Sequence, residues 1–545
     1  MARTRTIGRQ AALGGLTAAI ASLTGLPAAG ADELADLRAN QELLQRRIDQ
    51  LAQAQPPAPG GTPGGGIAGA MGSQAIPGQS IVGGSFPRSF LIPGTETSIR
   101  LGGYVDLTGL YFLNGASSGN PGRPTSNALQ NGNLPGVPLN GPIIVPGLPP
   151  QAQSTATSRG NGVFEFSPAQ SRINIETRTP TAWGEARTFF EFDFSGCNNF
   201  SCQTLQQAGS DSLLPRLRFA YGTLGGFLAG QAISNFSDAD ADTESMEFGG
   251  SMGSTGGYRV PQVRYTIAGP YSSAWSVSAE QPTSSVLTPA GILSSDSNVG
   301  ALPGGPGTAT IPATCNGVPC TGAGGAINGN IGRSIAPVLT AASYWAQPWG
   351  HVDFAAMLNP LNYNDGRYID RTYLGYGAHI AGDVKPGWFG WNKDDFLFSF
   401  VVGEGIGNYV SGGEATMIPM ATNFTVATSC ATATPTCIGG NAASNVLFKP
   451  VFGYSTNGGY QHWWTPELRS TIAAGVAQQD VSSQLIGPTQ AIAANKELWS
   501  AFINLVWNPV AFITTGVQYA YGKRIVVSNA KGNENVLIGK FRVAF

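Results

Sequence analysis

The sequence is short of charge and of long apolar runs, and each shortage excludes a class of protein. Charged residues make up 11% of the 545 residues, against about 25% in a typical soluble protein, which is too few to cover an ordinary soluble surface. The net charge of −2 provides no basic field, so we predict no nucleic-acid partner. Beyond the amino terminus the chain lacks the run of about 20 apolar residues that a membrane-spanning helix needs.

Enzyme motifs are also scarce. The chain has only three histidines, His351, His379 and His462. A G-x-S-x-G match surrounds Ser251, but it lacks the strand before it and the helix after it that a nucleophile elbow requires. We predict a non-enzymatic protein without a cofactor. A hydrolase with an exposed Ser–His pair is the alternative; His351 and Asp353 share one face, but that pair alone is weak support for it.

The amino terminus carries an export signal. Arg3, Arg5 and Arg9 precede a short apolar segment and the small residues of Ala29–Ala31, which is the pattern of a signal peptide. We predict that residues 1–31 are removed. A membrane-spanning helix is the alternative, and the segment is short for one.

The six cysteines form three local pairs. In an oxidising compartment such pairs predict loop disulfides; zinc binding is the rival, but no histidine lies nearby. The pairs are Cys197 with Cys202, Cys315 with Cys320, and Cys430 with Cys437.

Residues 32–88 differ from the rest of the chain. In residues 32–55, apolar residues recur at alternating intervals of three and four, with Gln41 as a single polar core position. This is a short heptad seam and predicts a coiled-coil segment; a lone solvated amphipathic helix is the alternative. Residues 56–88 are rich in Pro and Gly and predict a flexible linker.

From about residue 99 to the end, apolar and polar residues alternate with a period of two. In the first such stretch, one face holds Ile99, Leu101, Val105, Leu107 and Tyr111, and the other holds Arg100, Tyr104, Asp106 and Thr108. Later stretches repeat the pattern: we place Phe219 and Tyr221 on the apolar face opposite Arg216 and Arg218. This periodicity is that of strands with one polar and one apolar side.

Sixteen such stretches begin near residues 99, 161, 185, 215, 227, 259, 274, 337, 349, 371, 394, 446, 467, 496, 511 and 533. Short and long connections alternate between them. These features predict an all-β fold, a 16-stranded antiparallel transmembrane β-barrel over residues 89–545. A soluble sandwich is the alternative, but it would bury too many charges. Tryptophans near the strand ends predict interfacial girdles: Trp183, Trp345, Trp463, Trp464, Trp499 and Trp507.

The chain closes on "GKFRVAF", in which apolar or small residues alternate with charged ones and Phe545 is last. This ending resembles the carboxy-terminal signal that the barrel-assembly machinery recognises in outer-membrane proteins. We predict that the last strand pairs with the first and closes the barrel.

Several stretches resemble the trimeric DcaP-type porins: "SFLIPGTETSIRLGGYVDL", "LRFAYGTLGGFLAGQAISNF", "VPQVRYT" and "GGYQHWWTPELRSTIAAG". The resemblance implies a homotrimer in the outer membrane of a Gram-negative bacterium, in contact with lipid and lipopolysaccharide. It also implies a periplasmic coiled coil and uptake of dicarboxylic acids and other small anions.

Arginine outnumbers lysine 23 to 7, and several arginines fall on the inward face of the predicted barrel. Because guanidinium groups bind carboxylates through a planar fork, they predict an anion-guiding wall; bracing against inward Glu176, Glu185, Glu191 and Asp193 is the alternative. The wall consists of Arg100, Arg172, Arg178, Arg187, Arg216, Arg218 and Arg264.

The third long connection is acidic, and its position matches the loop that folds into the lumen of general porins. Carboxylates that face the arginine wall would create a transverse electric field across the narrowest part of the pore; a solvated outer loop is the alternative. The carboxylates of this connection are Asp238, Asp240, Asp242, Glu244 and Glu247. The spacing hints at calcium but fails as an EF-hand, because Thr243 and Gly249 replace the required Gly and Glu. We predict no metal site, and a looser calcium site is the alternative.

We therefore expect a passive porin for small hydrophilic solutes that prefers anions. A general porin without preference and a structural or adhesive surface barrel are the alternatives.

Overall fold

The computed structural model describes residues 83–114, 162–196, 214–246, 250–254, 258–282, 332–364, 370–410, 417–421, 446–480, 495–527 and 529–545, with short strand pieces between 285 and 328. The predicted signal peptide, the coiled-coil segment, most of the linker and the side chains of all six cysteines lie outside these residues. No helix in the described ranges is long and apolar enough to span a membrane.

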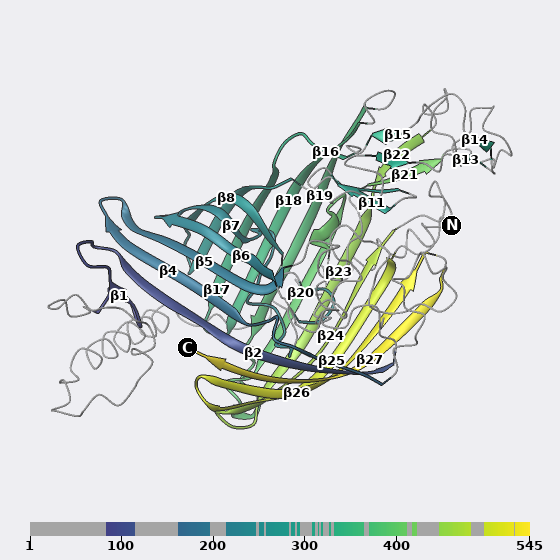
Figure 1. Ribbon diagram of the computed structural model, residues 1–545. Helices are drawn as coiled ribbons and strands as arrows, with labels where there is room; N and C mark the ends of the chain where they lie inside the picture. The colour runs from purple at the N-terminus through teal and green to yellow at the C-terminus, as the bar shows by residue number, and fades with distance from the viewer. Residues whose placement is uncertain are drawn as a thin grey trace, which may run out of the picture.

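The barrel is a single closed antiparallel sheet of 16 strands (Figure 1). Its elements are β2 (Ser98–Asn114), β3 (Val163–Ser167), β4 (Arg172–Thr181), β5 (Gly184–Gly196), β6 (Leu214–Leu224), β7 (Phe227–Ile233), β8 (Arg259–Ala268), β9 (Ser273–Glu280), β16 (Gly332–Ser334), β17 (Val338–Gln347), β18 (Gly350–Asn364), β19 (Asp370–Val384), β20 (Asp395–Glu404), β23 (Phe452–Trp463), β24 (Leu468–Gln479), β25 (Asn495–Val510), β26 (Ile513–Val526) and β27 (Lys531–Ala544). The pairs β3/β4 and β16/β17 each form one interrupted strand, since both members pair with the same neighbour.

Smaller elements stand outside the barrel wall. Strand β1 (Phe90–Leu91) pairs with the start of β2. Three small sheets contain β10 (Ser285–Thr288), β11 (Gly291–Ser294), β12 (Thr308–Thr310), β13 (Thr314–Cys315), β14 (Val318–Pro319), β15 (Ala326–Asn328), β21 (Met417–Ala421) and β22 (Val446–Pro450). Two short 3-10 helices are η4 (Trp388–Gly390) and η5 (Gly407–Tyr409).

The seam of the barrel lies between β2 and β27, as the sequence predicts. Their ladder runs from Tyr104 opposite Ala544 through Gly109 opposite Gly539, and Phe545 N–H donates to the carbonyl of Gly103 at 3.0 Å. Closure pairs the edge strands, which an open sheet would leave unsatisfied. In Figure 1 the first strand of the barrel wall, β2, accordingly runs beside the last, β27.

The period-two pattern gives the strand positions closely. All but one of the predicted starts fall within two residues of the observed start of a barrel strand. The exception is the start predicted near residue 446, which belongs to β22 in a separate small sheet, whereas the barrel strand β23 begins at Phe452.

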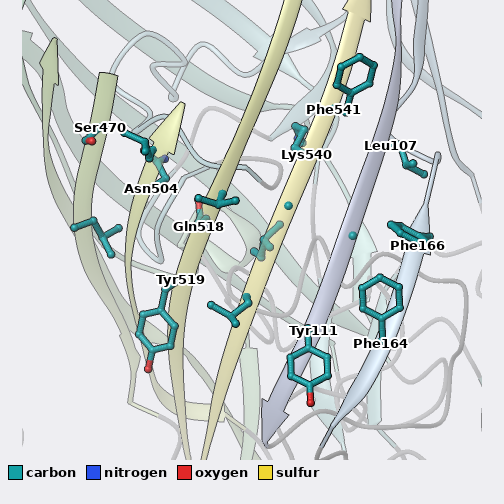
Figure 2. A pocket seen from close by; sticks show the side chains of 17 residues that line it. Leu107, Tyr111, Phe164, Phe166, Ser470, Asn504, Gln518, Tyr519, Lys540 and Phe541 are labelled. Atoms are coloured by element: carbon teal, nitrogen blue, oxygen red, sulfur yellow. The ribbon is translucent and has the colours of Figure 1, made fainter. Parts of the chain in front are cut away.

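The two faces of the sheet differ as predicted. On β2, Val105 is 63% exposed on the outer side, whereas Asp106 and Thr108 are fully buried inside. Figure 2 shows the outer side at the seam, where Leu107, Tyr111, Phe164, Phe166 and Phe541 border a shallow apolar depression of about 890 Å³. An apolar outer band and a polar interior are typical of a transmembrane barrel.

Two face assignments are wrong. The register of β5 on β6 shifts between Glu191↔Phe219 and Phe192↔Leu217, so a β-bulge at Arg218 turns Phe219 and Tyr221 toward the lumen with the arginines. The second error concerns Trp463. Its ring lies inside, 4.9 Å from the Arg469 guanidinium. Trp464 is exposed on the outer side, and neighbouring residues of a strand point to opposite faces.

The remaining tryptophans of the predicted girdles lie near strand ends. Trp183, Trp464, Trp499 and Trp507 are exposed on the outer side, and Trp345 is half-buried. Strongly exposed rings at both rims are what interfacial aromatic girdles require.

Candidate functional site: the barrel lumen

The connection between β7 and β8 lies inside the barrel. Its residues Phe236, Met246 and Met252 are almost fully buried against inward side chains of the wall. Met246 packs with Phe502 and Val506 of β25, while Phe236 and Met252 pack in a second cluster with Val401 of β20. We call described residues 234–246 and 250–254 the inner loop.

Polar contacts fix the inner loop to strands β23–β26. The Met246 N–H donates to Gln518 Oε1 at 2.8 Å, and the Met252 N–H donates to Ser500 Oγ at 2.6 Å. Glu244 receives both ends of the Arg469 guanidinium fork, at 2.6 and 2.5 Å. Such a bidentate pair fixes direction as well as distance.

A buried carboxylate supports the start of the inner loop. Glu280, at the end of β9, accepts hydrogen bonds from Ser234 Oγ and Asn235 N–H, both at 2.7 Å, and from Tyr409 Oη at 2.9 Å. Burial, with a contribution from Tyr258 and Glu280, holds the pKa of Tyr409 well above its usual range, so its hydroxyl remains a donor. Glu280 thus ties together β9, the inner loop and η5.

Seven arginines face the lumen from β2, β4, β5, β6 and β8, where the sequence places them. The lower group centres on Glu176, which is fully buried and receives three guanidiniums. Arg178 Nε and Arg187 Nε donate at 2.9 and 2.7 Å, and Arg100 donates as well. The three arginine side chains remain 26–33% exposed.

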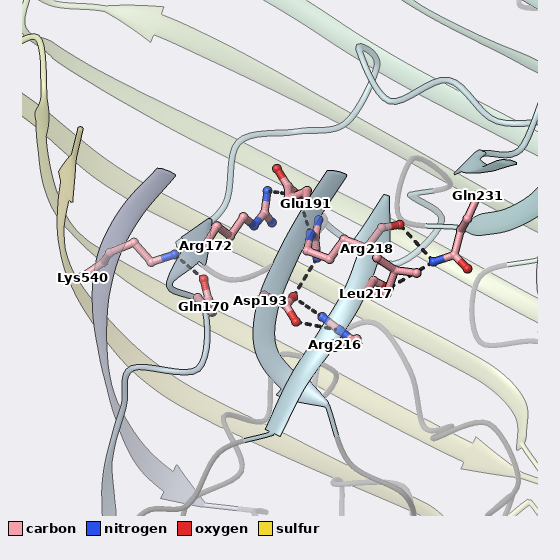
Figure 3. A network of polar contacts seen from close by, with 9 residues as sticks. All are labelled: Gln170, Arg172, Glu191, Asp193, Arg216, Leu217, Arg218, Gln231 and Lys540. Atoms are coloured by element: carbon pink, nitrogen blue, oxygen red, sulfur yellow. Dashed lines mark hydrogen bonds and ion pairs between the residues drawn. The ribbon is translucent and has the colours of Figure 1, made fainter. Parts of the chain in front are cut away.

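The upper group centres on Asp193 and Glu191 (Figure 3). Arg216 grips Asp193 with a fork of 2.9 and 2.5 Å. Arg218 joins both acids, donating to Glu191 at 2.6 Å and to Asp193 at 3.0 Å, and Arg172 lies 3.4 Å from Glu191. Every predicted bracing carboxylate is therefore engaged; Glu185 lies 3.5 Å from Arg178.

Arg264 differs from the other six. It is half-buried on β8 and interacts electrostatically with Glu280 and Tyr221. Its Nε finds no hydrogen-bond partner among the described residues.

The acidic residues are divided along the inner loop. Asp238 Oδ2 lies 2.7 Å from His351 Nε2, and the other ring nitrogen of His351 meets Asp383. Burial and the neighbouring Asp238 raise the pKa of Asp240. Asp242 accepts a hydrogen bond from Ser254 within the loop. Glu247 lies outside the described residues.

The described part of the loop has neither a metal cage nor a nucleophile elbow. No group of three or more His, Cys, Asp or Glu side chains in the described ranges is arranged to hold a metal ion. Ser251 is buried in the loop, where its N–H donates to Thr243 Oγ1, and its described neighbours form no helix.

Sequence reasoning missed several lumen residues. Phe86, ahead of β2, lies under Arg178 with the guanidinium 4.5 Å from its ring. Arg542 stacks at 3.9 Å on Tyr104 and donates to Asp106. Arg259 and the rings of Phe189, Phe219 and Tyr221 also belong to the basic wall. The strand period places Phe189 and Arg542 on the inward face, so these two could have been found from the sequence. Phe219 and Tyr221 could not, because the bulge changes the face to which they point.

The sequence pattern of the Porin subfamily matches residues 88–523. This chain belongs to the Porin subfamily. The porin also shares its fold with the outer membrane channel DcaP of Acinetobacter baumannii, with a TM-score of 0.56 and 19% identity over 85% of this chain and 100% of that one. The resemblance to DcaP-type porins is confirmed at the level of the fold.

Weaker likenesses accompany this match. OmpT of Vibrio cholerae reaches a TM-score of 0.42 at 7% identity, over 84% of this chain and 100% of that one. An anion-selective porin from Comamonas acidovorans reaches 0.41 at 8% identity, over 83% and 100% of the two chains. No curated protein sequence matches this chain.

Family and fold together make this protein an outer-membrane porin. By the general rule for such barrels, the short turns face the periplasm and the long loops face the outside. The lumen just described is therefore its candidate diffusion path.

Proposed function

We propose that the porin carries small hydrophilic solutes by passive diffusion and prefers anions, dicarboxylates among them. The arrangement around Glu176 supports this proposal most directly. One buried carboxylate pairs with three arginines whose side chains stay partly exposed. The wall thus hides its negative charge and presents positive charge to water.

The geometry of the guanidiniums favours carboxylates over other anions. Arg187 uses only its Nε for Glu176 within the described structure, which leaves both terminal amino groups for a ligand. The Arg216 side chain is 36% exposed, but its Nε and one terminal amino group already bond Asp193. Arg216 therefore contributes positive charge to the lumen and few free hydrogen-bond donors. A diacid that bridges the lower and upper groups would meet positive charge at both ends.

The inner loop supplies the opposing charge in this proposal. Its acids lie against β18 and β24, through His351 and Arg469, whereas the arginine wall occupies β2–β8. Solutes passing between the two sides would experience a transverse field, which orients dipolar molecules. We also infer that the porin is a homotrimer, that Phe545 belongs to an assembly signal and that residues 32–55 form a periplasmic coiled coil.

Reversal potentials in planar bilayers test the preference. With a KCl gradient across the membrane, we expect the purified porin to be anion-selective. Replacing Arg187, Arg216 and Arg218 by Gln should move the reversal potential toward zero. Lys496→Gln is the matched control, because Lys496 carries the same charge but bonds exposed Asn529 at the outer rim.

Two other outcomes would decide against the proposal. A cation-selective porin, or one in which the triple Gln variant and the control behave alike, would leave a general porin whose arginines only brace the wall. A barrel without measurable conductance would point to a structural or adhesive role.

A further inference from the structure

The basic wall contains an aromatic surface that simple anion guidance does not use. We propose that Phe189, Phe219 and Tyr221, together with Arg187 and Arg259, bind a planar aromatic carboxylate. The inference rests on the proposed anion preference and narrows its substrate class. We call these five residues the aromatic–arginine site.

The three rings form one contiguous surface on the inner side of β5 and β6. The ring centroids of Phe189 and Phe219 lie 5.9 Å apart, those of Phe189 and Tyr221 5.7 Å, and those of Phe219 and Tyr221 6.3 Å. Such distances are within the range in which aromatic rings attract one another in tilted arrangements. A fourth ring, from a solute, can extend the cluster by the same interaction.

Guanidiniums flank this surface. The Arg187 guanidinium carbon lies 5.5 Å from the Phe189 ring and 5.8 Å from the Tyr221 ring. The Arg259 guanidinium lies 5.9 Å from the Phe219 ring and close enough to Asp193 for electrostatic interaction. A carboxylate attached to a ring on this surface therefore has a cation within reach on either side.

Both cations have donors to spare. Within the described structure Arg187 uses only its Nε, for Glu176. Arg259 makes no side-chain hydrogen bond or ion pair there, although it lies among other arginines. A half-buried guanidinium crowded by like charges gains more from an incoming carboxylate than one already paired.

Burial distinguishes this cluster from the aromatic residues that merely fill space. Phe112, Phe236 and Tyr409 are also inside the barrel, but each is almost fully buried beneath the inner loop or among its supports. Phe189, Phe219 and Tyr221 are only half-buried. Their rings therefore retain area that a solute can cover.

The strand next to the cluster adds no side chain to it. Gly230 on β7 stands directly opposite Tyr221, and a Cβ at this position would lie 2.9 Å from the Tyr221 Cβ. No side chain therefore stands beside the Tyr221 ring on β7 at this level. On β8, the residue paired with Gly230 is Gln262, and Arg264 follows two residues later. The Arg264 side chain also interacts electrostatically with Tyr221.

Single-channel recordings with benzoate as the probe test the site. Cyclohexanecarboxylate has the same charge and similar size without an aromatic ring, and succinate is the non-aromatic diacid. We expect benzoate to interrupt the current for roughly fivefold longer than cyclohexanecarboxylate, as one added ring contact predicts. In the double variant Phe189→Leu/Tyr221→Leu this advantage should disappear, while events with succinate keep their duration.

Controls separate the site from general effects. Phe166→Leu removes a ring from the outer side and should change nothing. Tyr221→Phe keeps the ring and should keep the advantage of benzoate, whereas Arg259→Gln should shorten the benzoate events. The single variants keep the inference testable if the double variant does not fold.

Equal durations for benzoate and cyclohexanecarboxylate in the unmodified porin would overturn the inference, as would a benzoate advantage that survives the double variant. Failure of the underlying anion preference has a different signature, a cation-selective reversal potential in KCl alone.

Discussion

His351 Nε2 of β18 lies 2.7 Å from the Asp238 carboxylate of the inner loop. The imidazole stacks on Tyr344 with a centroid distance of 4.8 Å, and its other nitrogen meets Asp383 of β19. A histidine held between two carboxylates and stacked on a ring links the loop to two wall strands. The loop position, and with it the width of the lumen, depends on this contact and on the Glu244–Arg469 pair at the loop's far side.

Removing the negative charge of Asp238 should release this end of the inner loop. In Asp238→Asn the histidine retains only one carboxylate partner, Asp383, and we expect noisier open-channel currents in single-channel recordings. Asp242→Asn is the matched control, because it removes the same charge from a carboxylate that accepts a hydrogen bond from Ser254 within the loop. Equal noise in the two variants would show that the histidine contact does not hold the loop.

Gly475 of β24 gives the inner loop room to lie on the wall. A Cβ at this position would stand 1.6 Å from the Met252 carbonyl oxygen, so Gly475→Ala must displace the loop. We expect an altered single-channel conductance and a loss of stability of about 1–3 kcal/mol, as overpacking typically causes. Gly539→Ala is the control, since a Cβ there meets nothing within 4 Å. Wild-type conductance in Gly475→Ala would contradict the packing described here.

The barrel could be predicted from the sequence because its rule is local. On β2, the inward positions of Arg100, Tyr104 and Asp106 follow from a period of two, which needs no knowledge of distant residues. The same rule fails at Arg218, where a bulge admits an extra residue and carries Phe219 and Tyr221 inward. Trp463 and Trp464 could not both face lipid, because adjacent residues of a strand point to opposite faces of the sheet.

The interior contacts could be predicted only in outline. The inner loop was expected from its order along the chain and from its acids, but the partner of Glu244 was not. Glu244 and Arg469 are 225 positions apart, and they meet only because the barrel closes and the loop crosses it. Arg259 was missed because the alternation of β8 puts position 259 on the same parity as the outward Val263 and Tyr265, whereas its guanidinium lies 5.9 Å from the inward Phe219 ring.

Glu280 should be a structural carboxylate that does not contribute to selectivity. Glu280→Gln replaces charge-assisted hydrogen bonds by weaker ones and adds donors where Ser234, Asn235 and Tyr409 already donate. We expect a loss of about 1–3 kcal/mol, measured by thermal unfolding in detergent, with an unchanged reversal potential. Glu467→Gln, in the exposed β23–β24 turn, is the matched control. A shift in ion selectivity without a loss of stability would show that Glu280 acts on solutes.

We expect the Asp394 carboxylate, at the periplasmic rim, to make the stability of the porin depend on pH. It lies just before β20, and its side chain is 1% exposed. It accepts hydrogen bonds from Tyr460 Oη and the Trp463 N–H and pairs with His462 at 2.6 Å. Burial alone would raise the pKa of Asp394, but the contacts with His462, Tyr460 and the Trp463 backbone outweigh it and lower the pKa below 3.8.

Because the folded-state pKa is depressed, Asp394 stabilises the porin above the ordinary carboxyl pKa of 3.8, and this contribution is lost as the pH falls through the lower folded value. Asp394→Asn should therefore lower the unfolding temperature at pH 7, by an amount equivalent to about 1 kcal/mol for each weakened hydrogen bond. At a pH below the folded value, wild type and variant should unfold at more nearly the same temperature. A difference that is the same at both pH values would mean that the carboxylate charge contributes nothing and that the side chain acts only through its shape.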